Sequence, residues 1–318
     1  MSAQKGLLSI SGLIILTLVT IIFISLFLIK DFQSETQVNP TATKTQLSSK
    51  NSLKFDFTAS QQDPFNDPNG PFYHQVFLAS SPDGLNFTKE DDVLFDKASV
   101  PDIIRLPNGR IFAYMVDGAK RSKSGILVAL SDDDGKSWDL GSLQIKSKSG
   151  FAGTDPEAIL LNDGTIRLFY IVFGAKNKVL SAASTDGVNF NQDEGIRFEY
   201  PKITDPDISI INDKWFMYLS QGPKLIAATS DDGLTFKLKN TVREIGSVSN
   251  TVYVDVDFWR QFYCFEGKIK SAKTKDGLTF QDEPGFRLEP QSGKTICDPA
   301  PVHLGGSWLM LYKDTPGR

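Results

Sequence analysis

A short turn motif is repeated five times along this chain of 318 residues. Each copy contains a Ser or Thr, an Asp, a Gly and an aromatic residue in the same order, and the glycines lie 44 to 52 residues apart. A repeat of this length is typical of propeller blades. The copies are Ser81–Phe87, Ser131–Trp138, Ser184–Phe190, Ser230–Phe236 and Thr274–Phe280. The chain is therefore built mainly from one unit that is used five times.

Each repeat predicts four short strands. In the repeat that ends with the third copy of the motif, residues 157–161, 165–170 and 178–183 are apolar runs, and a fourth strand opens at Phe190. Antiparallel strands reverse direction at every turn, so the repeated motif and the turn between the first two strands lie on one face. The connections between repeats and the loops between the second and third strands lie on the other face.

The last repeat contains only its first two strands, at residues 299–304 and 307–312. The two missing strands occur at the front, at residues 74–80 and from Phe87 onward. The sequence therefore predicts an all-β fold over residues 55–318, a five-bladed β-propeller of four-stranded antiparallel blades. An N-terminal hairpin closes the ring, which removes the exposed sheet edges.

The region before the propeller divides into two parts. Residues 7–29 are apolar over 23 positions, enough to span a bilayer, and they lack the cleavage site of a secretory signal. We expect residues 1–30 to form a single transmembrane helix, with a cleaved signal as the alternative. Residues 31–54 are polar and predict a flexible stalk. The protein is then a single-pass membrane protein with an extracytoplasmic propeller.

Charge and cysteine content narrow the classes of partner. The net charge of −4 and the pI near 5.4 argue against binding to nucleic acid, which needs a clustered basic surface. We expect a monomer. Cys264 and Cys297 are the two cysteines of the chain, and they could form one disulfide or stay as two free thiols.

A second repeat lies at the start of each blade's first strand. Aligning the strands by their turns gives the triplets Val100-Pro101-Asp102, Asp155-Pro156-Glu157, Asp205-Pro206-Asp207, Asn250-Thr251-Val252 and Asp298-Pro299-Ala300. Residues i and i+2 of a strand share a face, so one triplet can direct two carboxylates into the central channel. The sequence predicts a ring of six acids at the channel mouth, where crowding of like charges raises pKa values.

These motifs resemble two groups of known propellers. The turn motif resembles the Asp-box (BNR repeat) of sialidases, for which we expect a structural role. The Asp-Pro triplets, with Asp155 through Gly164 as the best match, resemble the five-bladed glycoside hydrolases of family 43 and its relatives in families 32, 62 and 68. The resemblance implies an inverting two-carboxylate hydrolase.

The same resemblance suggests roles for the ring. Asp102 is the expected base, Asp155 the residue that orients and tunes the acid, and Glu157 or Asp207 the acid, with Asp205 as a further candidate. Two departures from family 43 are Val100 at the position of the family's base and the lack of a clear Glu-x-Pro. The competing interpretation is that Asp-Pro merely turns the chain into each strand.

Further residues are candidates for substrate binding. They are Asn250, Asp298, Lys120, Lys176 and Lys224, with Phe65, Phe72 and Tyr73 for stacking on sugars. The lysines follow glycines in the loops on the mouth face and could hold an anionic sugar or offset the acidic field. We expect no required cofactor and no metal cluster, although the ring could hold a cation such as calcium.

Three functions follow as hypotheses. The first is a membrane-tethered glycoside hydrolase that acts on polysaccharide or oligosaccharide. The second is a non-catalytic propeller that uses the same mouth to bind a glycan or a protein. The third is a sialidase-like hydrolase, which would need six blades and three arginines for its substrate.

Overall fold

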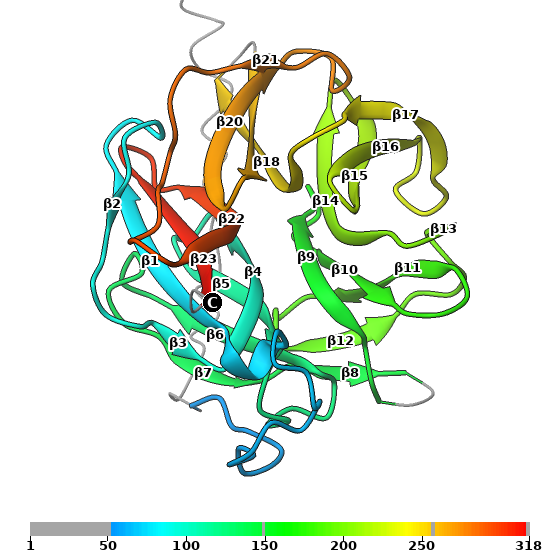
Figure 1. Cartoon of the computed structure of the whole chain (residues 1–318). Coiled ribbons are helices and arrows are strands. Elements are labelled where there is room, and N and C mark those ends of the chain that lie inside the picture. The colour runs from blue at the N-terminus through cyan, green and yellow to red at the C-terminus, as the bar shows by residue number, and fades with distance from the viewer. Residues whose placement is uncertain (1–51, 148–149, 256–257, 316–318) are drawn as a thin grey trace, which may run out of the picture. The chain divides into compact units, whose positions relative to one another are not determined.

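The predicted five-bladed propeller is confirmed in the computed structural model, which describes residues 52–147, 150–255 and 258–315. Five sheets, antiparallel apart from one outer strand pair in the second blade, surround a central channel, and the first strand of each blade lies innermost (Figure 1). The predicted membrane anchor and residues 31–51 of the stalk lie outside the described residues. Within the described part of the chain, no helix is long and apolar enough to cross a membrane.

Blades 1, 3 and 4 are plain four-stranded sheets, each ordered from the channel outward. Blade 1 contains β4 (Ala98–Arg105), β5 (Ile111–Asp117), β6 (Ile126–Ser131) and β7 (Asp139–Ser142). Blade 3 contains β14 (Thr204–Ile211), β15 (Lys214–Gln221), β16 (Lys224–Ser230) and β17 (Lys237–Arg243). Blade 4 contains β18 (Ser247–Asp255), β19 (Phe258–Phe265), β20 (Lys268–Thr274) and β21 (Gln281–Asp282).

Blades 2 and 5 carry extra strands on the same four-stranded plan. Blade 2 contains β9 (Thr154–Leu160), β10 (Ile166–Val172), β11 (Asn177–Ser184) and β12 (Asn189–Gln192), extended by β8 (Gln144–Lys146) and β13 (Phe198–Tyr200). Blade 5 contains β22 (Thr295–His303), β23 (Trp308–Thr315), β1 (Gln75–Ser81) and β2 (Thr88–Lys89), and β3 (Phe95–Asp96) pairs with β1. A 3-10 turn, η1 (Pro71–Tyr73), precedes β1.

The ring closes where the two ends of the propeller meet. Strand β1 pairs with β23 along its whole length, from Gln75 opposite Asp314 to Ser81 opposite Trp308. In Figure 1 the red C-terminal strands lie beside the cyan β1. The predicted closure by an N-terminal hairpin is therefore confirmed, and it completes the fifth blade with strands from both ends of the propeller.

The hydrophobic core is divided into clusters that lie between neighbouring blades. One cluster, for example, joins Phe112 and Tyr114 of blade 1 to Leu168 and Phe190 of blade 2. Four similar clusters occupy the other blade boundaries. Burial of these side chains therefore holds the blades face to face, which is the packing of two sheets in a β-sandwich.

The repeated turn motif fixes each blade to the one before it. In the third copy, the Ser184 hydroxyl donates to Asp186 (3.0 Å) and accepts from the Gly187 N–H (3.0 Å). Gly187 has φ +78, and a Cβ there would lie 2.6 Å from the Phe112 ring of blade 1. The Phe190 ring packs edge-on against Tyr114, with 5.9 Å between centroids. Equivalent contacts occur in the other four copies, which gives the motif a structural role in this chain.

Candidate active site

Each inner strand has a bulge close to its start, on the face opposite the repeated turn motif. The bulged residue has a positive φ, between 47° and 52°, and the pairing with the second strand shifts register there. We call these five residues the mouth ring. They are Val100, Asp155, Asp205, Val248 and Asp298. The residues two positions further along form the deep ring: Asp102, Glu157, Asp207, Asn250 and Ala300.

The predicted alignment of the fourth blade is wrong by two residues. Its bulge is at Val248, so the triplet is Val248-Ser249-Asn250 and not Asn250-Thr251-Val252. In the other four triplets, a proline follows the bulged residue. Blade 4 has no proline at this position, so the signal that located the other triplets is absent. Asn250 therefore belongs to the deep ring and occupies the position that carboxylates take in blades 1 to 3.

The mouth ring joins three carboxylates and one lysine. The Asp155 carboxylate accepts hydrogen bonds from the Asp205 N–H (3.3 Å) and the Thr154 hydroxyl (2.8 Å). Asp298, in blade 5, is the third carboxylate, and it forms an ion pair with Lys313 of β23, at 2.5 Å. The ammonium group of Lys313 thus supplies a positive charge inside a ring of acids.

Burial and crowding raise the pKa of the Asp155–Asp205 pair. Burial is the main cause for both carboxyls, and repulsion from Asp155 and then Asp298 brings the pKa of Asp205 to about 8. Burial alone would lower the pKa of Lys313, but the adjacent Asp298 raises it above its usual value. At neutral pH the mouth ring therefore holds a proton on the Asp155–Asp205 pair, beside the Lys313–Asp298 ion pair.

The carboxylates of the deep ring connect adjacent blades. Asp102 accepts the Ala158 N–H of blade 2 (2.7 Å), and Glu157 accepts the Ile208 N–H of blade 3 (3.1 Å). Asp207 accepts the Thr251 N–H of blade 4 (3.0 Å). Each acid thus satisfies a buried donor of the next inner strand, which gives these acids a structural role whatever else they do.

Asn250 spans the channel within the deep ring. Its amide group donates to Asp102 (2.9 Å) and lies 3.4 Å from Glu157. The pKa of Glu157 is raised well above its usual value, first by burial and then by repulsion from Asp102 and Asp207. Asn250, which the sequence suggested as a substrate ligand, is therefore committed to a buried network.

The cavity at the mouth is small, and only some of the predicted catalytic residues line it. Its volume is about 20 Å³, which is room for about one water molecule. Asp155, Glu157, Asp205 and Asp298 line it, together with prolines and residues of blade 4. Asp102 and Asp207 do not line it, and they are 2% and 0% exposed. Asp102, the expected base, and Asp207, one of the two expected acids, therefore lack access to this cavity.

The three predicted lysines do not line the mouth cavity. Lys176 and Lys224 pair with Glu199 (4.0 Å) and Glu244 (2.7 Å). Lys120 donates to the Pro64 carbonyl (3.1 Å). The lysine that does reach the mouth ring is Lys313, which sequence reasoning missed. Its one visible signal is that it is a charged residue at the end of the apolar run 308–312.

A disulfide connects blades 4 and 5 next to the mouth. Cys264 of β19 and Cys297 of β22 are bonded, with 5.3 Å between their Cα atoms, a usual separation for a disulfide. The Asp298 N–H points to the sulfur of Cys264 at 3.2 Å. The bridge therefore restrains the strand that carries Asp298. In the part of the chain that the structure describes, no group of three His, Cys, Asp or Glu residues could hold a metal ion.

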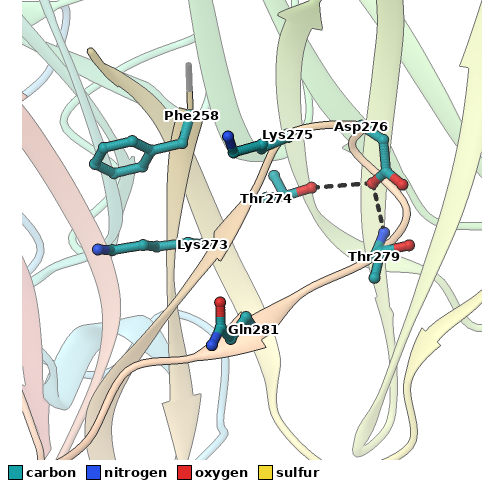
Figure 2. Close-up of a pocket in the computed structure, with 7 residues that line it drawn as sticks. All are labelled: Phe258, Lys273, Thr274, Lys275, Asp276, Thr279 and Gln281. Carbon is teal, nitrogen blue, oxygen red and sulfur yellow. Dashed lines mark hydrogen bonds between the residues drawn. The ribbon is translucent and has the colours of Figure 1, made fainter. Parts of the chain in front are cut away.

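Another hollow lies on the opposite face, at the turn motif of blade 4. It has a volume of about 500 Å³ and is lined by Phe258, Lys273 and the turn that contains Asp276. Figure 2 shows the two hydrogen bonds that the Asp276 carboxylate accepts, from the Thr274 hydroxyl (3.3 Å) and the Thr279 N–H (2.7 Å). Lys273 stacks over the Phe258 ring at 4.8 Å. The carboxylate and the lysine here are already engaged in structural contacts.

The raised pKa values predict that stability falls as pH rises. A carboxyl with a higher pKa in the folded state than in the unfolded state contributes fully below its unfolded pKa, and this contribution is lost as pH rises through the folded value. The folded values are about 8 for Asp205 and about 6 for Asp207, both raised mainly by burial. In Asp205→Asn, we expect the drop in melting temperature from about pH 5.5 to 8.5 to shrink by at least 2–4 °C, or roughly 1 kcal/mol.

The control for this measurement is Asp91→Asn, at an exposed carboxyl of the loop after β2, which should leave the pH dependence unchanged. His74 acts in the opposite direction, because burial and then Lys313 lower its pKa to about 4. Its effect is confined to the range below about pH 6.5 and does not disturb the comparison. An identical alkaline drop in wild type and Asp205→Asn would show that Asp205 is already ionised at neutral pH.

Comparisons with known proteins identify the fold. No family model and no curated protein matches the sequence. Among solved structures, a thermostable family-43 glycoside hydrolase is similar, with 17% identity over 69% of this chain and 86% of that one and a TM-score of 0.55. A novel alpha-L-arabinofuranosidase from Clostridium thermocellum has 16% identity, covering 66% and 80% of the two chains, with a TM-score of 0.52.

A family 117 glycoside hydrolase from the marine bacterium Zobellia galactanivorans is also similar. It has 14% identity, a TM-score of 0.51 and coverage of 83% of this chain and 91% of that one. The likeness spans most of each of these chains at low identity. The protein therefore has the five-bladed propeller fold found among glycoside hydrolases of families 43 and 117.

Proposed function

We propose that the protein is a glycoside hydrolase that acts on polysaccharide or oligosaccharide at its mouth ring. The observation that carries this proposal is that two kinds of carboxyl group line one small cavity. The Asp155–Asp205 pair holds a proton, and Asp298 is ion-paired with a lysine. Hydrolysis with inversion needs one protonated carboxyl, one ionised carboxylate and a water molecule between the latter and the sugar. The fold, shared with family 43 and family 117 hydrolases, supports the same class of reaction.

The residues of the mouth ring take the following roles. Asp205 donates the proton to the leaving oxygen, and burial together with repulsion from Asp155 keeps the pKa of Asp205 raised. Asp298, ion-paired with Lys313, accepts the proton of the attacking water. The cavity has room for that water, and the sugar lies above the ring at the channel opening. We assign the base to Asp298 and not to Asp102, because the two oxygens of Asp102 already accept hydrogen bonds from the Ala158 N–H and the Asn250 amide.

A second candidate is a non-catalytic propeller that binds a glycan at the same opening. This candidate is favoured because valines, Val100 and Val248, occupy two of the five mouth positions, which therefore lack a carboxylate. A sialidase-like activity has less support, because the fold has five blades. Arg105 also pairs with Asp134 (3.2 Å), at the turns of the opposite face.

We further propose that the propeller acts outside the cytoplasm and is tethered through residues 7–29. The Cys264–Cys297 disulfide supports this location, because disulfides persist mainly in oxidising compartments. The long apolar segment supports the tether. A carbohydrate is then the expected partner of the mouth, and we expect the protein to be a monomer.

The test is hydrolysis of a panel of plant and microbial glycans by the full chain, beside Asp155→Asn and the control Asp91→Asn. We expect release of sugar from at least one glycan, a drop of at least about tenfold in Asp155→Asn and no change in the control. Binding of a glycan without release of sugar would favour the non-catalytic propeller. Equal turnover in Asp155→Asn would place the chemistry elsewhere.

A further inference from the structure

A large aromatic cleft lies between blades 1 and 2. It has a volume of about 830 Å³, within the usual range for ligand pockets. Its floor includes Val116, Ile171 and Val172, from the ends of β5 and β10. Four phenylalanine rings line it: Phe57, Phe65, Phe151 and Phe173. The mouth cavity cannot hold a sugar ring, whereas this cleft can hold several.

The four rings come from three separate segments and remain exposed. Phe57 and Phe65 lie in the segment before β1, which bonds to the loop after β5 through the Ser60 N–H and the Ala119 carbonyl (2.8 Å). The exposed fractions range from 41% for Phe65 to 66% for Phe173. A group of exposed apolar side chains that rims one hollow is typical of a binding surface. The flat faces of such rings suit the C–H faces of sugars.

The cleft and the mouth cavity are lined by neighbouring residues of β9. Thr154 lines the cleft, and its hydroxyl donates to Asp155 of the mouth ring at 2.8 Å. Gly153, its neighbour, also lines the cleft, and a Cβ there would lie 2.2 Å from the Ile171 carbonyl oxygen. The backbone between cleft and mouth is therefore packed closely against β10. A chain of sugar rings lying in the cleft would have one end at the acids.

The cleft lining carries two lysines and two aspartates, and one of the aspartates is ion-paired with an arginine. Lys120 and Lys123 line it, and neither forms an ion pair with a described carboxylate. Lys120 lies over the Phe65 ring at 5.3 Å. Asp117 is neutralised by Arg121 (3.0 Å) and accepts the Ser122 N–H (2.7 Å). Two lysines thus offer unpaired positive charge beside the aromatic rings, and Asp67 is the remaining acid of the lining.

We propose that this cleft binds an acidic oligosaccharide, in which sugar rings stack on the phenylalanines and carboxylate or sulfate groups meet Lys120 and Lys123. The proposal rests on the proposed function, because it makes the cleft the substrate-binding extension of the mouth ring. The lysines also offset the acidic ring that a negatively charged sugar must approach. Binding to the cleft itself does not depend on hydrolysis and can be measured separately.

The test is calorimetric binding of three trisaccharide probes to the full chain. The probes are trigalacturonate, its fully methyl-esterified neutral form and a sulfated galactan trisaccharide. We expect trigalacturonate, the sulfated probe or both to bind, and the neutral form to bind at least about tenfold more weakly. Phe173→Ala should raise the Kd of the acidic probe about three- to tenfold. Lys123→Ala should raise it similarly and reduce its salt dependence.

The matched controls are Phe286→Ala and Lys268→Ala, because Lys268 stacks over the exposed Phe286 ring at 4.3 Å in blade 4. Both should leave binding unchanged. The proposal is overturned if none of the probes binds, if the neutral and acidic forms bind equally, or if the controls weaken binding as much as the cleft variants do. Acidic probes that bind in the cleft without being hydrolysed would overturn the proposed hydrolysis while supporting the cleft.

Discussion

Replacing Asp205 with asparagine is expected to lower the rate of hydrolysis by about 10²- to 10⁴-fold, the usual contribution of a general acid. The amide cannot donate the proton that the leaving oxygen needs. In the wild type, activity should fall as the pH rises through about 8, because Asp205 acts in its protonated form and has its pKa there. Initial rates from about pH 5 to pH 9, on the glycan found in the panel, measure both effects.

The matched control is Asp207→Asn, which makes the same chemical change in the deep ring. Asp207 accepts from Thr251 and Ser249, and it does not line the mouth cavity. This variant should lose stability and yet keep the alkaline limb of the rate profile at the same pH. If Asp205→Asn kept more than a tenth of the activity, or Asp207→Asn removed the alkaline limb, the acid would have to be assigned to the deep ring.

The fold could be predicted from the sequence because its main determinants are local. The repeated turn motif marks every blade, since Gly187 and its equivalents need a positive φ and Phe190 and its equivalents need a packing partner. The missing strands of the last repeat also have a local signal, the apolar run before Ser81. These signals suffice for blade number, strand order and closure.

The candidate site was harder to predict, because it depends on the register of the bulges. A bulge shifts the following residues by one position, and blade 4 carries no proline to mark it. The two layers of acids could not be separated for the same reason, so Asp102 and Asp155 were expected at one level. Whether Cys264 reaches Cys297 also depends on how blade 4 packs on blade 5, which spacing alone does not determine.

The cleft and the mouth lysine depend on contacts between distant segments. Phe65 was a sequence candidate and does line the cleft, but Phe72 and Tyr73 instead pack edge-on against each other in η1, at 5.3 Å. Phe173 had no local signal of function, and Lys313 had only its place as a charged residue at the end of an apolar run. Phe173 shares the cleft with the segment before β1. Asp298, the partner of Lys313, lies in the same blade, but the charges of Asp155 and Asp205 act on Lys313 only when the ring closes.

Lys313→Met is expected to destabilise the folded protein by about 3–5 kcal/mol, the usual cost of removing one partner of a buried ion pair. Methionine has a similar length and no charge, so the variant leaves Asp298 uncompensated beside Asp155 and Asp205. The Asp298 side chain is 3% exposed and that of Lys313 is 17% exposed, so water can replace little of the lost interaction. Urea-induced unfolding at neutral pH measures the change in the free energy of unfolding.

A second variant separates the charge effect from simple loss of packing. Lys313→Met combined with Asp298→Asn removes both charges, so the double variant should be more stable than Lys313→Met alone by about 1–3 kcal/mol. The single variant should also recover stability as the pH falls and the mouth acids take up protons. Equal instability of the two variants at all pH values would mean that Lys313 acts through its packing. In the expected outcome, the lysine is the charge that lets three aspartates share one opening, which is the condition for the proposed chemistry.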